Sequence, residues 1–125
     1  MSRILRSALA IAAGDAIFGL TAVLLFRMAG YDPHAPAAKE FVIASMALGV
    51  IAAASGGWVT AAIAGHHRRE HAAVLGILIA SGALISLVLS SRTGAIWTQV
   101  AAVVLMAPAA LAGSWPWWSK SANSA

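Results

Sequence analysis

Four long apolar runs divide this chain and constrain its fold more than any other feature. They cover residues 7–26, 41–65, 72–91 and 93–119, and Asp15 is the one charged residue inside them. Each run meets the roughly 20 residues that a helix needs to cross the hydrocarbon core of a bilayer. Because lipid offers no hydrogen bonds to the backbone, we expect each run to be an α-helix.

The connections between these runs predict how the helices are arranged. Those near residues 65–71 and 91–94 are so short that consecutive helices must be antiparallel neighbours. The sequence therefore predicts the all-α class, with a four-transmembrane-helix up-down-up-down bundle. Residues 1–125 form a single integral membrane domain in this prediction, with helices at about 7–27, 41–65, 72–91 and 95–118. The first run is longer than the apolar region of a signal peptide, so we expect a retained transmembrane helix.

The basic residues predict the orientation of the bundle. The chain has 8 Lys and Arg and a net charge of +4, but these residues are scattered at the ends of the apolar runs, which indicates topology and not a nucleic-acid partner. Five lie on one side of the bundle and three on the other: Arg3, Arg6, Arg68, Arg69 and Lys120, against Arg27, Lys39 and Arg92. Because cytoplasmic loops retain Lys and Arg, we expect both termini in the cytoplasm.

Small residues recur every fourth position in the second run and predict its role in packing. One row comprises Ser45, Gly49, Ala53, Gly57, Ala61 and Gly65, and Gly56 belongs to a second row beside it. Gly76 and Ala80 make a shorter row in the third run. Such rows let membrane helices approach closely, so we expect the second helix to be central. In the fourth run, Pro108 should kink the helix.

The turn after residue 65 contains most of the imidazoles. Its candidate surface residues are His66, His67, Arg68, Arg69 and His71. His67, Glu70 and His71 match the H-x-x-E-H pattern of one metallopeptidase class, but no Asp, Glu or His follows His71 to complete a site. We expect a charged turn at the cytoplasmic surface that fixes topology. The alternatives are weak binding of a metal or of anionic lipid headgroups, and ligation of a haem by the histidines. The preferred prediction includes no metal and no cofactor.

Asp15 is the candidate functional residue, because an acid near the bilayer centre is costly and is by default a functional-site hypothesis. No Lys, Arg or His shares its depth, and an apolar environment disfavours the charged form, so we expect a neutral, hydrogen-bonded carboxyl group. Ser55, Trp58, Ser81 and the backbone at residues 56–57 are candidate partners. Two roles remain open: interhelical hydrogen bonding, and a proton- or cation-linked function.

One part of the sequence carries a resemblance. Gly56-Gly57-x-x-x-Ala61-x-Ile63-Ala64-Gly65, followed by His71-Ala72-x-x-Leu75-Gly76, resembles the central hairpin of small four-helix bacterial integral membrane proteins of no known activity. The resemblance implies a bacterial inner membrane and supplies no functional residues. The size, the four helices and an acid in the first helix are also similar in architecture to the small multidrug resistance transporters, whose corresponding acid is a Glu.

Two functions from different classes are consistent with these features. The first is a multi-pass membrane protein without enzymatic activity, which is either a self-associating bundle or an accessory subunit of a larger membrane complex. The alternative is a small proton-coupled transporter or permease that uses Asp15. We do not expect an enzyme, because no nucleophile, general base and orienting group converge at a recognisable spacing. The chain also has no cysteine, which excludes thiol chemistry.

Overall fold

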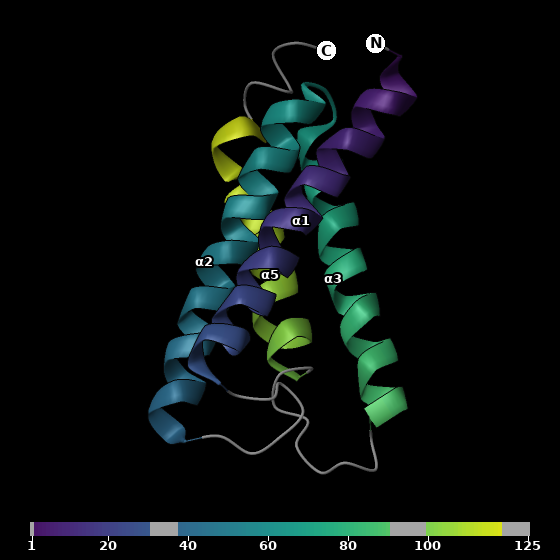
Figure 1. Ribbon diagram of the computed structural model, residues 1–125. Helices are drawn as coiled ribbons and strands as arrows, with labels where there is room; N and C mark the ends of the chain where they lie inside the picture. Colours follow the sequence, from purple (N-terminus) through teal and green to yellow (C-terminus); the bar gives the residue numbers. More distant parts are fainter. Residues whose placement is uncertain (1, 31–37, 91–99, 119–125) are drawn as a thin grey trace.

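The described structure is almost entirely helical. A computed structural model describes residues 2–30, 38–90 and 100–118, and no strand occurs in that part of the chain. In order, its elements are α1 (Arg3–Ala29), α2 (Lys39–Ala64), α3 (Arg68–Ser90), the π-helix η1 (Ala102–Met106), α5 (Ala107–Gly113) and the short 3₁₀ turn η2 (Trp115–Trp117) (Figure 1). This confirms the all-α class.

Three of these helices are long and apolar enough to cross a membrane. They are α1, α2 and the Arg68–Ser86 part of α3, whereas the apolar segment Ala102–Trp117 is shorter. The chain is therefore a membrane protein by the length and composition of its described helices. Residues 95–99 of the fourth predicted helix lie outside the described residues.

Local capping sets the helix ends beyond the apolar runs. α1 begins at Arg3, ahead of the predicted start, because the Ser2 hydroxyl accepts a hydrogen bond of 3.1 Å from the Leu5 amide. It stops where Gly30 adopts a left-handed conformation with φ of 76°, and α2 stops in the same way at Gly65, with φ of 74°. The hydropathy pattern did not predict the charged turns at the helix ends, because these turns lie outside the apolar part of each helix.

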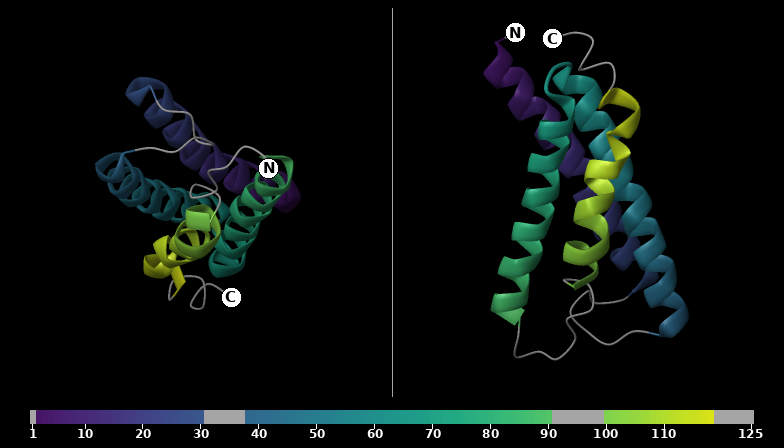
Figure 2. Two further views of the ribbon diagram at one scale, coloured as in Figure 1. Left: turned by 90° about the horizontal axis from the view of Figure 1, so that it is seen from below. Right: turned by 180° about the vertical axis from the view of Figure 1, so that it is seen from behind.

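The helices are arranged around the α2–α3 hairpin. Figure 1 shows α1 crossing in front of this hairpin, and Figure 2 shows α5 on the opposite side, between α2 and α3. The start of α1, the α2–α3 turn and η2 lie at one end of the bundle, called here the terminal end. α2 contacts α1, α3 and α5, in agreement with a central position.

Glycines lie where helix backbones meet. A Cβ atom on Gly56 of α2 would lie 2.6 Å from the carbonyl oxygen of Gly14 in α1, so only glycine fits this contact. A Cβ atom on Gly57 would collide with the carbonyl oxygen of Ala110 in α5, and one on Gly76 of α3 would lie 2.8 Å from that of Ala107. Direct backbone packing therefore joins α1 to α2, α2 to α5 and α3 to α5.

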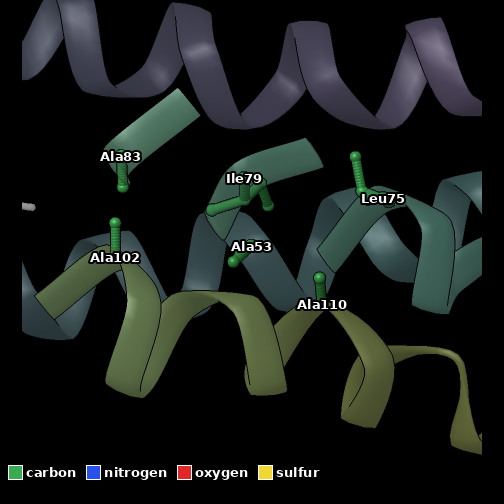
Figure 3. Close-up of a cluster of buried hydrophobic side chains, with 6 residues drawn as sticks. All are labelled: Ala53, Leu75, Ile79, Ala83, Ala102 and Ala110. Atoms are coloured by element: carbon green, nitrogen blue, oxygen red, sulfur yellow. The ribbon is translucent and has the colours of Figure 1, made fainter. Parts of the chain in front are cut away.

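The core is built from small side chains. Its buried cluster takes one alanine from α2, three residues from α3 and one alanine each from η1 and α5 (Figure 3): Ala53, Leu75, Ile79, Ala83, Ala102 and Ala110. Leu75 is the largest apolar side chain that is fully buried among the described residues. Since lipid tails are as apolar as this core, close van der Waals contact holds the bundle together.

Pro108 changes the helix type just before it. The residues from Ala102 to Met106 form a π-helix, and the Ala107 amide donates to the Ala102 carbonyl, five residues earlier. A proline ring clashes with the carbonyl group four residues before it, and a wider turn relieves that clash. A π-helical turn therefore comes just before Pro108, whereas the kink expected there stays a prediction.

Candidate functional site

Asp15 lies on the outer surface of the bundle. It is 12 residues from Arg3 and 14 from Ala29, which places it roughly 18 and 21 Å from the two ends of α1. The preceding residue, Gly14, is buried against α2, so Asp15 projects about 100° around the helix from that contact. Its side chain is exposed, and no group within residues 2–30, 38–90 and 100–118 hydrogen-bonds or ion-pairs with it.

The predicted partners of Asp15 lie elsewhere. Ser55 and Ser81 are exposed on α2 and α3 and make no hydrogen bond to it. Trp58 packs on Trp117, with ring centroids 5.4 Å apart, and the backbone of Gly56 faces Gly14. The orientation of α1 thus separates Asp15 from the hydroxyl groups that share its depth.

A threonine makes a buried polar contact between α1 and α2. The Thr60 hydroxyl is fully buried and donates a hydrogen bond of 2.9 Å to the Ala10 carbonyl. Thr60 lies four residues after Gly56 in the second row of small residues on α2, and the sequence prediction did not include this interhelical bond. The signal was present, because a hydroxyl group in such a row can hydrogen-bond across the interface.

The terminal end concentrates positive charge. Four of the described arginines lie there, Arg3, Arg6, Arg68 and Arg69. Arg6 reaches from α1 to the end of α2, where its Nε donates a 2.6 Å hydrogen bond to the Ile63 carbonyl. A cation at a helix C-terminus also interacts favourably with the helix dipole.

The histidine turn is attached to α1 as well. His71 Nε2 lies 2.8 Å from the Ser7 hydroxyl, and its Nδ1 lies 2.8 Å from the His67 carbonyl oxygen. His66 Nδ1 lies 2.9 Å from the Ala64 carbonyl oxygen, and its ring packs against that of His71. His67 takes a positive φ of 43°, which lets the chain turn into α3. Three of the four imidazole nitrogens of His66 and His71 thus contact the protein itself.

Tryptophans at the end of the last described segment pack on the arginines of the α2–α3 turn. The Arg68 guanidinium lies 4.6 Å from the ring centroid of Trp117, and that of Arg69 lies 4.8 Å from Trp118. The Trp118 indole N–H donates to the buried Ser114 hydroxyl at 2.6 Å. These contacts join the α2–α3 turn to the end of the apolar segment Ala102–Trp117, called here the fourth segment. Among the described residues, no group of three or more His, Asp or Glu could hold a metal ion.

An apolar cavity of about 220 Å³ lies away from the terminal end, between α1, α2 and η1. Phe18 and Phe26 line it from α1, Gly49 from α2, and Met106 from η1. The hydroxyl groups of Thr21 and Ser45, which also line it, donate to carbonyls of their own helices. The cavity wall is therefore apolar in character, and Asp15 is not part of it.

The predicted packing residues occupy several different interfaces. Ser45, Ala53 and Ala61 are buried, and Ala80 is half-buried. Gly49 faces Met106, and Gly65 lies just past α2 beside the Arg6 guanidinium. Together with the glycine contacts described above, these positions show that the small residues of α2 pack against α1 and the fourth segment.

Comparisons with known proteins add no function to this geometry. No protein-family model, curated protein or solved structure matches the chain. Its function has to be inferred from the site itself.

Proposed function

We propose that this protein is a multi-pass membrane protein without enzymatic activity that associates with another membrane-embedded surface. That surface is either a second copy of the chain or a larger membrane complex of which this protein is an accessory subunit. One observation carries the proposal: Asp15, midway along α1, is exposed and has no partner among the described residues.

The energy of a carboxyl group in lipid supports this proposal. On insertion scales, an Asp at the centre of a membrane helix costs about 2.5–3.5 kcal/mol. Such residues almost always face a bundle interior or a water-filled cavity, and Asp15 faces neither in the described bundle. A protein surface that covers α1 and hydrogen-bonds to Asp15 removes most of this cost.

Proton-coupled transport through Asp15 is the alternative function, and the geometry supports it less. Transport requires a route from both sides of the membrane to the carboxyl group. The cavity between α1, α2 and η1 has an apolar wall and does not include Asp15. Association requires only the exposed face that α1 already presents.

The proposal also includes a membrane topology. The fourth segment crosses the bilayer as well, giving four crossings of a bacterial inner membrane with both termini in the cytoplasm. Its support is the path of the segment, which extends from Ala102 in the core cluster to Trp117 beside Arg68 at the terminal end. A periplasm-only reporter fused after Ala125 should be inactive, and activity there would contradict the proposed topology.

The mass of the particle in its native lipid tests association. Membranes are extracted with a styrene–maleic acid polymer, which keeps neighbouring proteins in one lipid disc, and the protein content of each disc is measured by native mass spectrometry. We expect discs that hold this 12.7 kDa chain together with a second copy or a larger subunit. Discs that hold a single chain and no other protein would contradict the proposed function.

A further inference from the structure

The exposed face of α1 has a regular spacing. Leu5, Ala8, Ala12, Asp15 and Gly19 follow one another at alternating intervals of three and four residues, and are called here the α1 seam. This spacing is that of the contact line in left-handed pairs of helices. Leu5, Ala8, Ala12 and Asp15 are exposed. Gly19 is half-buried, and a Cβ atom on it would have nothing within 4 Å.

The α1 seam is free along its length in the described bundle. Figure 1 shows α1 in front of the hairpin, with no described element covering its outer side. The next positions in the same spacing, Ala22 and Phe26, line the apolar cavity, and Phe26 also packs on Phe41 at 5.4 Å. The seam therefore ends near Gly19 and covers about 21 Å of the helix axis.

Its residues suit close contact between two helices. Three of the five have no side chain larger than a methyl group, which allows two backbones to approach closely. The two larger side chains are Leu5 and Asp15. In its protonated form, a carboxyl group has both a donor and an acceptor. Two such groups can satisfy each other without any further residue.

Symmetry favours a second copy as the partner. Two copies inserted in the same orientation and related by a twofold axis along the membrane normal carry Asp15 at the same depth by construction. A different protein would need a polar group of its own at this depth. The chain itself supplies the complementary group, the small neighbours and the register.

We propose that two copies of this chain associate in parallel through the α1 seam, with the two Asp15 carboxyl groups hydrogen-bonded to each other across the twofold axis. This inference rests on the proposed function, since it names the surface and the partner of the same association. It takes the protein as a homodimer and assigns Asp15 to its contact.

Disulfide cross-linking in native membranes tests the surface, because the chain has no cysteine of its own. Single substitutions Ala8→Cys and Gly19→Cys are oxidised with copper phenanthroline. Both should give a band of twice the chain mass, since a parallel pair brings each position next to its own copy. Gly82→Cys is the matched control, because Gly82 lies on α3 and a Cβ atom there also has nothing within 4 Å.

Two further variants test the contact itself by the dimer fraction in lipid discs. Gly19→Leu should abolish the dimer without affecting the fold of the protomer, whereas Gly82→Leu should leave the dimer unchanged. Asp15→Leu should weaken dimerisation roughly 3- to 30-fold, the range of interhelical hydrogen bonds in membranes. Asp15→Asn should keep most of it, because a pair of amides also matches donors with acceptors.

Different results would overturn the proposed function and the proposed dimer. Discs with a larger subunit and no cross-link at Ala8 or Gly19 would overturn the dimer and leave the proposed function standing, whereas discs with a single chain would overturn both. Cross-linking of Gly82→Cys as efficient as that of Gly19→Cys would indicate random collision and overturn the seam. An unchanged dimer fraction in Asp15→Leu would overturn the carboxyl pair.

Discussion

Replacing Gly56 by alanine adds one methyl group at a direct backbone contact between α1 and α2. The new Cβ atom would lie 2.6 Å from the Gly14 carbonyl oxygen and 3.3 Å from its carbonyl carbon. Because both neighbours are backbone atoms, no side chain can rotate away. The two helices must separate by about 0.8 Å to lengthen the closer contact from 2.6 Å to the 3.4 Å at which ordinary van der Waals contact begins.

The energetic effect has two opposing parts. Overpacking of this kind costs about 1–3 kcal/mol. Removal of a helical glycine returns roughly 0.5–1 kcal/mol through the unfolded chain. The separation also lengthens the nearby bond from Thr60 to the Ala10 carbonyl, which starts at 2.9 Å. We expect a net loss of about 0.5–2 kcal/mol in the free energy of unfolding for Gly56→Ala.

Reversible unfolding in mixed micelles, titrated with sodium dodecyl sulfate and followed by circular dichroism, measures this difference. Gly82→Ala is the control, because the same methyl group meets open space on α3. It should be neutral or more stable than the wild type by up to about 1 kcal/mol. Gly56→Ala as stable as Gly82→Ala would refute the close backbone packing of α1 on α2.

Three further variants test the other polar groups. Thr60→Val removes the hydroxyl group while keeping the shape, and should destabilise the protein by about 0.6–1.7 kcal/mol in the same titration; no change would contradict the bond to Ala10. Replacing His66, His67 and His71 together with Gln should preserve insertion and expression, and stoichiometric zinc or haem that only the wild type retains would contradict a purely structural turn. Asp15→Asn should behave like the wild type in proteoliposomes with an imposed pH gradient; solute flux that only the wild type supports would favour the transporter.

Hydropathy alone was sufficient to predict the helical class and the approximate helices. The apolar runs had to satisfy their backbone internally, and the structure has helices over each described part of them. The helix ends differ because they depend on Ser2, Gly30 and Gly65, which act through local hydrogen bonds and left-handed φ values. The rows of small residues similarly indicated α2 as the most contacted helix.

The orientation of α1 about its own axis could not be predicted. In a soluble bundle the apolar face identifies the core, but in a membrane both the core and the lipid-facing surface are apolar. Gly14 and Gly19 show the difficulty, since one is buried against α2 and the other meets open space. Asp15 could therefore be assigned a depth from the sequence, but neither a direction nor a partner.

The reactivity of Asp15 toward dicyclohexylcarbodiimide tests most directly whether protein covers it in the membrane. This apolar reagent enters the bilayer and modifies neutral carboxyl groups, and Asp15 is the one acid between Arg6 and Arg27. Mass spectrometry compares its rate of modification in native membranes with that in proteoliposomes diluted to one chain per vesicle. Association predicts slow modification in native membranes and fast modification after dilution. Equally fast modification in both would show that Asp15 faces lipid in the membrane and would contradict the account.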